Sequence, residues 1–227
     1  MRTAAILPVK SFTRAKQRLG ESVAADMRMQ LARAMVDDVL LALSETEAIA
    51  RIVVVTREPS VAAPARRRGA IVVEDAAEEG QSAAVGLGVR WALDEGIERV
   101  LCIPGDCPAL DPAELASLLR ARPEEAEVVI VPDRHGTGTN GLLLTPPDAI
   151  APSFGPNSCE RHRALALAAG VPCRLERPAS LLLDIDTGAD LDVLRERLAG
   201  ERSRAARTRN VLGQPERTNV LPITNTG

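Results

Sequence analysis

Short apolar runs alternate with stretches of helical character along most of this chain, and this alternation limits the folds open to it. Strands that alternate with helices favour a mostly parallel sheet with helices on both faces. We therefore predict a single Rossmann-like α/β domain. The predicted strands are 4–9, 51–56, 70–73, 99–103, 127–131, 141–145 and 181–185, and the predicted helices are 22–44, 59–68, 82–95, 112–120, 159–169 and 189–198.

The alternation ends near Gly200, and the composition changes there. Residues 1–200 are predicted to form the domain, because a chain of this length can bury a sizeable core. Residues 201–227 begin with ERSRAARTRN and continue into a segment that contains Thr, Asn and Pro. We expect this second segment to be a polar, disordered tail.

The overall charge and the aromatic content exclude several classes of partner. The 28 Lys and Arg residues are balanced by 31 Asp and Glu residues, so no basic field attracts nucleic acid or a membrane surface. Aromatic residues are too few for base stacking. No apolar run approaches the ~18 residues of a membrane helix, and Lys10 follows the first run too soon for a signal peptide. We expect a cytoplasmic protein.

A cluster of cations follows the first apolar run. In open α/β sheets, ligands bind at the carboxyl ends of the strands, which is where this cluster is expected to lie. Cationic side chains together with Ser11 and Thr13 suit a triphosphate better than a neutral metabolite. The cations are Lys10, Arg14, Lys16 and Arg18.

Acidic residues follow two other predicted strands. Asp106 lies in the turn Pro104–Pro108, and it could hold a divalent cation or only bond neighbouring backbone amides. In a strand over 181–185, Asp184 and Asp186 would project to the same side, roughly 7 Å apart, and could share a cation. The alternative is that Asp186 begins a turn and Asp184 ends an exposed strand.

Two further segments favour an anion site. Residues 134–140 form a glycine-rich loop, and FGPNS leads directly into the predicted helix 159–169. Ser158 or Asn157 at the start of that helix, with free backbone amides behind it, would bind an anion, although both segments could be an ordinary turn and cap. Neither loop matches the P-loop or the dinucleotide-binding motif.

The cysteines form no zinc framework. Cys102 lies in an apolar run, so we expect a buried side chain. Cys159 and His162 would share a helix face and could form half a metal site or a nucleophile and base, but no third partner is nearby in the sequence.

Five segments together resemble the 2-phospho-L-lactate or phosphoenolpyruvate guanylyltransferases of coenzyme F-420 biosynthesis. They are LPVKSFTRAKQRL, GDCPAL, GTGTNGLLL, FGPNSCERH and LLLDIDTGADL, and the resemblance extends over about 3–198. It implies a nucleotidyltransferase domain of the GT-A-like type. The chain has Gly80-Gln81-Ser82 where we expect Gly-Leu-Asn, and Pro8-Val9-Lys10 where wider relatives have a Gly-Gly loop.

The resemblance also implies a role for each group of residues. The phosphorylated acid would contact Thr139 (or Thr137), Gly155 and Ser158, and magnesium would be held by Asp106, Asp184 and Asp186. The nucleotide would be held by Lys10, Arg14, Lys16, Gly80 and Ser82. Lys10, Lys16 and Asp106 would be the catalytic residues.

The implied reaction joins GTP to 2-phospho-L-lactate, phosphoenolpyruvate or 3-phosphoglycerate and releases diphosphate. A downstream enzyme would then pass the product to a deazaflavin. A phosphate monoester is largely dianionic at neutral pH, so the nucleophile needs no general base. The alternatives that stay open are a molybdopterin-type nucleotidyltransferase, a nucleotide-sugar glycosyltransferase and a non-catalytic nucleotide-binding regulator.

Overall fold

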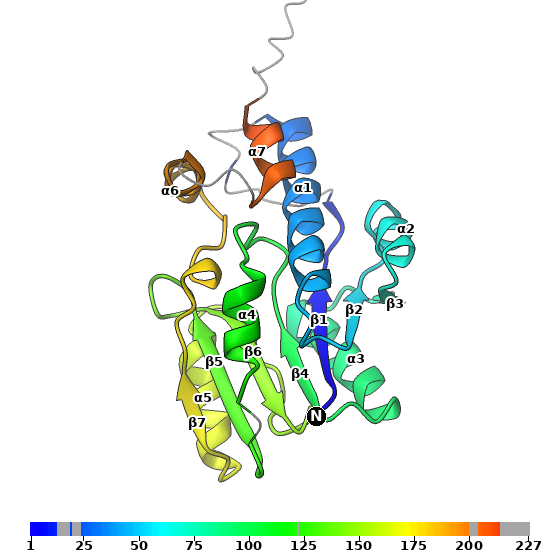
Figure 1. The fold of residues 1–227 in the computed structure, drawn as a ribbon, viewed down its shortest axis with the longest axis vertical. Coiled ribbons are helices and arrows are strands. Elements are labelled where there is room, and N and C mark those ends of the chain that lie inside the picture. The colour runs from blue at the N-terminus through cyan, green and yellow to red at the C-terminus, as the bar shows by residue number, and fades with distance from the viewer. Residues whose placement is uncertain (13–18, 20–23, 122, 200–203, 214–227) are drawn as a thin grey trace, which may run out of the picture.

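The computed structural model describes residues 1–12, 19, 24–121, 123–199 and 204–213. They form a seven-stranded sheet with helices on both faces (Figure 1). The strands are β1 (Thr3–Pro8), β2 (Arg51–Val55), β3 (Ile71–Val73), β4 (Arg99–Cys102), β5 (Glu127–Pro132), β6 (Thr139–Thr145) and β7 (Cys173–Leu175). The helices are α1 (Ala25–Ser44), α2 (Pro59–Arg67), α3 (Gln81–Asp94), α4 (Pro112–Leu118), α5 (Ser158–Ala168), the 3-10 helix η3 (Ala179–Leu181), α6 (Gly188–Ala199) and α7 (Ala206–Leu212).

The strand order is β3-β2-β1-β4-β6-β5-β7, and β6 is the antiparallel member. The other pairings are parallel, so the predicted α/β fold with a mostly parallel sheet is confirmed. Only residues 133–138 separate β5 from β6. A connection this short cannot cross over the sheet, which explains the reversed direction of β6.

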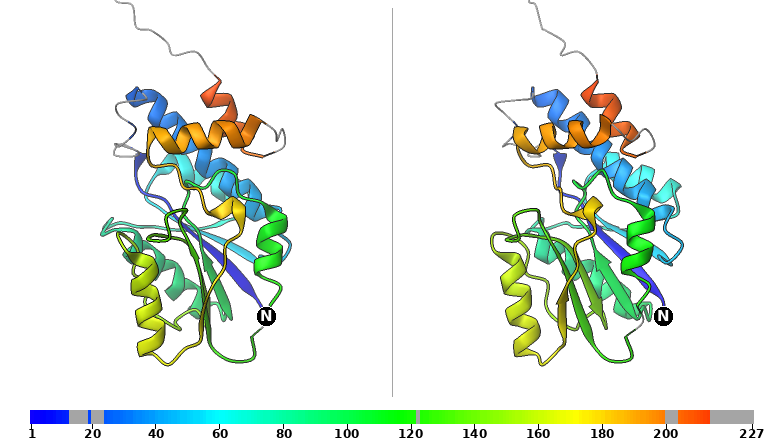
Figure 2. Two further views of the ribbon diagram at one scale, coloured as in Figure 1. Left: turned by 90° about the vertical axis from the view of Figure 1, so that its left-hand side faces the viewer. Right: turned by 60° about the vertical axis from the view of Figure 1, so that its left-hand side comes forward.

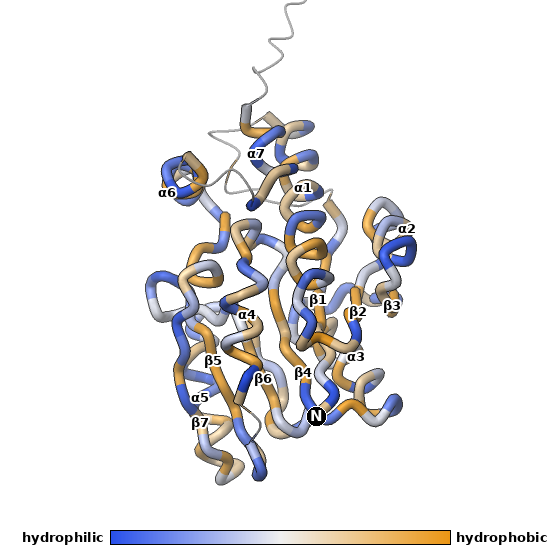
Figure 3. Tube along the Cα trace, viewed as in Figure 1, coloured by the Kyte–Doolittle hydropathy of each residue, from blue (hydrophilic) through white to orange (hydrophobic). Residues whose placement is uncertain are grey.

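Alternate residues of the strands pack on opposite faces of the sheet. In β1, Ala5 and Leu7 join a buried cluster with α1, α2 and α4, whereas Ala4 and Ile6 join another with α3 and α5. The views of Figure 2 show these helices on both sides of the sheet, and Figure 3 shows the hydrophobic residues gathered along the strands. The two buried faces anchor β1 at the centre of the molecule.

Helix α3 approaches β1 closely at Gly88. A Cβ atom added to Gly88 would lie 2.6 Å from Cγ2 of Ile6, which is shorter than any real contact. The absence of a side chain at this position therefore sets how near α3 can pack to the central strand.

The sequence prediction was wrong at two places in the sheet. Leu181 is the last residue of η3, and residues 182–185 belong to no strand, so the prediction over 181–185 is wrong. Cys173–Leu175 instead forms the edge strand β7, pairing parallel with β5. This strand has three partly exposed residues and carried no apolar run that would predict it.

The structure also differs from the predicted disordered tail at residues 204–213. These residues include α7, and Figures 1 and 2 show α7 lying beside α1. The carboxylate of the buried Asp38 on α1 accepts hydrogen bonds from the Arg207 amide (3.2 Å) and the Thr208 amide (2.8 Å) at the start of α7. Asp38 thus caps α7 from another helix. Residues 201–203 and 214–227 lie outside the described residues.

We predict that Asp38→Ala lowers the free energy of unfolding by about 1–2 kcal/mol, because α7 then loses its capping carboxylate. Urea denaturation measures this change. The matched control is Asp37→Ala, because Asp37 forms a surface ion pair with Arg68 (3.3 Å), which is worth about 0–1 kcal/mol. Equal losses in the two variants would contradict the capping role.

Within the residues described, every helix is too short or too polar to cross a lipid bilayer.

Candidate active site

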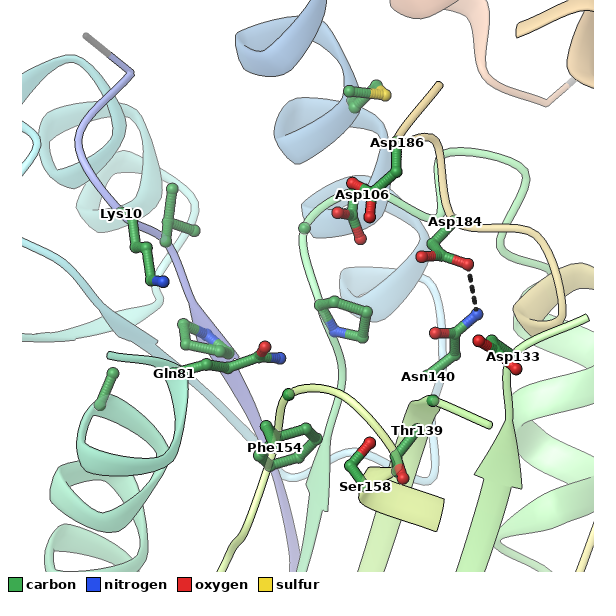
Figure 4. Close-up of a pocket in the computed structure, with 18 of the residues that line it drawn as sticks. Lys10, Gln81, Asp106, Asp133, Thr139, Asn140, Phe154, Ser158, Asp184 and Asp186 are labelled. Atoms are coloured by element: carbon green, nitrogen blue, oxygen red, sulfur yellow. Dashed lines mark hydrogen bonds between the residues drawn. The ribbon is translucent and has the colours of Figure 1, made fainter. Parts of the chain in front are cut away.

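A cleft of about 970 Å³ opens at the carboxyl ends of β1 and β4 (Figure 4). The start of the antiparallel β6 reaches the same edge, because β6 runs in the opposite direction. The cleft therefore collects residues from distant parts of the chain. Its lining includes residues 8–12, 104–106, 137–140 and 154–158, together with Asp75, Gln81, Asp133, Asp184 and Asp186.

The turn that carries Asp106 is held against α1. A Cβ atom on Gly105 would lie 2.8 Å from Val36 on α1, so glycine allows this close approach. The Asp106 carbonyl oxygen accepts a hydrogen bond from the Ile185 amide at 3.1 Å. This backbone bond joins the Asp106 turn to the segment that carries Asp184 and Asp186.

Asp184 and Asp186 both line the cleft, while Leu183 before them and Ile185 between them are buried. The predicted shared side of the two carboxylates is therefore confirmed, although no strand produces it. Burial and the charge of Asp106 raise the pKa of Asp184, and the charge of Asp186 raises it further. The three carboxylates are thus close enough to repel one another.

Oxygen donors crowded in this way suit a hard divalent cation such as Mg²⁺, which takes carboxylate ligands and keeps waters or phosphate oxygens. Among the described residues, however, no three His, Cys, Asp or Glu side chains are arranged to hold an ion. In Figure 4, Asp106 and Asp186 lie together, and Asp184 reaches toward Asn140, whose side-chain nitrogen donates to it at 3.2 Å. The donor chemistry fits magnesium, and the magnesium site stays a prediction.

The segment after Asp186 is fixed by a reciprocal cap at the start of α6. The Asp190 carboxylate accepts from the Thr187 amide (2.7 Å) and the Asp186 amide (3.1 Å), while the Asp190 amide donates to the Thr187 hydroxyl (3.3 Å). Arg134 pairs with Asp190 at 2.6 Å. Thr187 and Asp190 thus form a capping box.

The start of α4 has a single side-chain cap, and the acid three residues later has another role. Asp111 caps α4 by accepting from the Ala113 amide at 2.9 Å. Glu114 instead accepts from the Ser180 amide at 2.8 Å, and so ties α4 to η3.

Lys10 lies across the cleft from the three carboxylates, and its side chain extends toward Gln81 (Figure 4). The predicted nucleotide residues Arg14 and Lys16 lie outside the described residues. Ser11, which we grouped with the cations, donates its amide to the Glu78 carboxylate (3.2 Å) and its hydroxyl to Glu58 (3.5 Å). These acids hold the chain directly after Lys10.

The predicted nucleotide contacts at Gly80 and Ser82 stay a prediction. The described lining of the cleft contains Gln81 between them, but neither of these two residues. The Ser82 hydroxyl accepts a hydrogen bond from the Phe154 amide at 2.8 Å, so it links α3 to the 154–158 loop. Buried Asp75, which follows β3, also lines this end of the cleft and was missed, because no strand-end motif marks it.

Thr139, Gly155 and Ser158 all line the cleft, as the resemblance implied. We expected free backbone amides at the start of α5 to bind an anion, but the first two of these amides already donate to carbonyl groups. The Ser158 amide donates to the Gly155 carbonyl and the Cys159 amide donates to the Thr137 carbonyl, each at 3.1 Å. Side-chain hydroxyls therefore offer better contacts here than the first two helix amides.

The two threonines of the repeated sequence GTGT both line the cleft, but their side chains have different partners. Thr137 donates its amide and its hydroxyl to the Asp133 carboxylate, at 2.9 and 3.3 Å. Thr139 instead lies 3.1 Å from Nδ1 of His162, behind the cleft wall. The position of His162 could have been inferred from Ser158, because residues at i and i+4 share a helix face.

The suggested pairing of Cys159 with His162 is not formed. Both ring nitrogens of His162 have other partners, Thr139 and the Ser153 amide. Burial raises the pKa of the Cys159 thiol, which disfavours a thiolate nucleophile. Cys102 is buried as expected.

The sequence matches a known protein family. A family model described as "Guanylyl transferase CofC like" matches residues 3–213. The chain is 51% identical over 220 residues to a phosphoenolpyruvate guanylyltransferase from Conexibacter woesei, which covers 96% of this chain and 99% of that protein. It is 39% identical over 194 residues to one from Sphaerobacter thermophilus, covering 86% and 93% of the two chains.

Solved structures show the same fold at low identity. A nucleotidyl transferase from Methanothermobacter superposes with a TM-score of 0.64 at 20% identity, covering 88% of this chain and 98% of that one. A CMP:2-keto-3-deoxy-manno-octonic acid synthetase complexed with CTP superposes with a TM-score of 0.58 at 14% identity, covering 88% and 100%. Identities this low establish the architecture alone.

Proposed function

The chain belongs to the guanylyl transferase CofC-like family of nucleotidyltransferases, and on this basis we propose that it transfers the guanylyl group of GTP to phosphoenolpyruvate. The named relatives support phosphoenolpyruvate over 2-phospho-L-lactate and 3-phosphoglycerate as the acceptor. The product would serve the assembly of coenzyme F-420.

One observation carries this proposal. A single cleft has a lysine on one wall, three crowded carboxylates on another, and buried hydroxyls beside them (Figure 4). Such a cleft can bring two mutually repelling phosphates together, which is the main difficulty of the reaction. Neither loop beside the cleft carries a P-loop motif that would instead favour nucleotide hydrolysis.

The bonds that change are few. A phosphate oxygen of phosphoenolpyruvate forms a bond to the α-phosphorus of GTP, and the bond from that phosphorus to the bridging oxygen breaks to release diphosphate. The attacking phosphate is already anionic, so no side chain has to remove a proton from it. The described residues of the cleft accordingly supply binding and charge balance.

The acceptor side of the cleft offers neutral donors. The hydroxyls of Thr139 and Ser158 can donate to the phosphate or carboxylate of the acid, and Gly155 brings the backbone close to them. Asn140, beside Thr139, holds Asp184 in place. A magnesium ion held by Asp106, Asp184 and Asp186 would offset the negative charge of the two substrates.

The nucleotide side offers a cation and a carboxylate. Lys10 can pair with the phosphates of GTP. The buried Asp75 carboxylate, on the same side as Gln81, can accept from the N–H groups on the edge of guanine. Adenine, cytosine and uracil do not present the same pair of adjacent donors, so this placement supports a preference for GTP.

The proposal is tested by measuring diphosphate release from GTP, ATP, CTP and UTP, each with phosphoenolpyruvate, 2-phospho-L-lactate and 3-phosphoglycerate. We expect the highest kcat/KM for GTP with phosphoenolpyruvate. A higher value for another pair would replace the proposed substrates. Binding of GTP without product from any acid would indicate a non-catalytic regulator.

We predict that Lys10→Ala raises the KM for GTP about tenfold or more, because a charge-assisted contact to phosphate is lost. The KM for phosphoenolpyruvate should change less. Initial rates measured over a range of each substrate separate the two effects. Arg51→Ala is the control, since the exposed Arg51 begins β2 at the opposite edge of the sheet. An unchanged KM for GTP in Lys10→Ala would remove Lys10 from the site.

A further inference from the structure

His162 lies directly behind the acceptor side of the cleft, and its hydrogen bonds define which ring nitrogen carries the proton. The Ser153 amide lies 2.9 Å from Nε2. A backbone N–H can only donate, so Nε2 must be the acceptor and carry no hydrogen. The ring is fully buried, and burial together with the charge of Arg161 lowers its pKa to about 4. At neutral pH the ring is therefore uncharged, with its one hydrogen on Nδ1.

This tautomer has a consequence for Thr139. Nδ1 of His162 lies 3.1 Å from Oγ1 of Thr139, so the Nδ1–H donates to that oxygen. The hydroxyl hydrogen of Thr139 cannot point back at the same N–H and must be directed elsewhere. Thr139 lines the cleft, which leaves its hydroxyl as a donor on the acceptor side.

The surroundings hold His162 in this arrangement. The ring of Phe154 meets the imidazole edge to face, with the ring centres 5.1 Å apart. The guanidinium of Arg161 donates to the carbonyls of Ser153 and Phe154, at 2.9 and 3.0 Å, and to the Ser153 hydroxyl at 3.0 Å. These contacts fix the backbone whose amide selects the tautomer, so the orientation does not depend on a bound substrate.

We propose that His162 is a positioning residue, which holds the Thr139 hydroxyl as a hydrogen-bond donor toward an anionic group of the acceptor. This inference rests on the proposed function for the identity of the acceptor. It assigns His162 no proton transfer and no contact with the substrate. It also explains why a buried neutral imidazole stands at a site for anions, where a charged one would be expected to bind them directly.

The ring tautomer can be measured without any activity. Nitrogen-15 NMR distinguishes a protonated ring nitrogen from an unprotonated one. The chain has two histidines, so in the His135→Gln variant every imidazole nitrogen signal comes from His162. We expect a neutral ring at pH 7 with hydrogen on Nδ1. A hydrogen on Nε2, or a charged ring, would overturn the proposal.

The functional consequence is tested by a double-mutant cycle. His162→Phe keeps a ring against Phe154 but removes the donor, and it should raise the KM for phosphoenolpyruvate about tenfold with little change in the KM for GTP. Thr139→Val should do the same, and the double variant should be no worse than Thr139→Val alone. His162→Asn, which can place an amide donor near the position of Nδ1, should recover part of the loss.

A purely structural role would give a different result. If His162→Phe lowers the melting temperature and leaves the KM for phosphoenolpyruvate unchanged, the proposal is wrong. If the wild-type protein releases no diphosphate with any acid, the proposed function fails instead. Calorimetric binding of phosphoenolpyruvate to wild type, His162→Phe and Thr139→Val then decides the positioning role, and equal affinities in all three would overturn it.

Discussion

Asp106→Asn should reduce kcat for diphosphate release by about a thousandfold, which corresponds to roughly 4 kcal/mol of lost stabilisation. The replacement keeps the shape of the side chain and removes its charge. Asp106 lies in the cleft with Asp184 and Asp186, where its charge helps to raise the pKa of Asp184. A neutral amide there would weaken the binding of a divalent cation and leave the substrate phosphates repelling one another. Steady-state rates at saturating GTP and phosphoenolpyruvate measure the effect.

The fold should survive this change, because the structural contact of residue 106 to Ile185 is made by its backbone carbonyl. Circular dichroism and the melting temperature of Asp106→Asn should therefore match those of the wild type. Asp192→Asn is the matched control, since Asp192 is exposed and pairs with its helix neighbour Arg195 away from the cleft lining described above. A rate for Asp106→Asn close to that of Asp192→Asn would remove Asp106 from the proposed metal site.

Gly88→Ala should lower the free energy of unfolding by about 1–3 kcal/mol, because the added methyl group overpacks the contact with Ile6. The Cγ2 atom of Ile6 is held by a branched side chain in the buried centre of the sheet, so it cannot move aside at low cost. Helix α3 would have to shift away from β1. Urea denaturation gives the change in stability.

The same helix provides a matched control. At Gly86 an added Cβ would meet only the end of the Arg90 side chain, at 3.8 Å. Gly86→Ala should therefore raise stability by about 0.5–1 kcal/mol, because alanine loses less backbone entropy in a helix. If the two substitutions change the free energy of unfolding in the same direction, the contact of Gly88 with Ile6 does not set how closely α3 packs on β1.

Most elements of this fold could be predicted because apolar runs mark buried strands directly. The segment after η3 shows where that reasoning fails. Leu181, Leu183 and Ile185 are buried in alternation with less buried neighbours, which is the pattern of a strand. The segment buries one side, but it is not a member of the sheet. The spacing of apolar residues predicts which side chains are buried. It does not predict whether another strand lies alongside to form hydrogen bonds.

The direction of β6 could have been predicted and was not. Residues 133–138 are too few to cross the sheet between parallel strands. Helix α7 was a harder case, because its segment is rich in arginine and was interpreted as a tail. Its position depends on Asp38, a buried carboxylate far away in the sequence.

The candidate site divides in the same way. Asp106 comes after β4, Thr139 begins β6 and Ser158 begins α5, and all three line the cleft together with Asp184 and Asp186. His162 was considered only with Cys159, because the sequence cannot show that its ring faces a residue on β6. The role of His162 depends on a contact between a helix and a strand, which no motif within either element predicts.

The hydrogen bond from the Ile185 amide to the Asp106 carbonyl joins two acidic loops through the main chain alone. The bond uses main-chain atoms, and the buried side chain of Ile185 holds the same segment from within. Replacing the acid at 106, 184 or 186 should therefore leave the two loops at the same separation. Differences in rate among such variants would then report the lost carboxylate and not a displaced backbone.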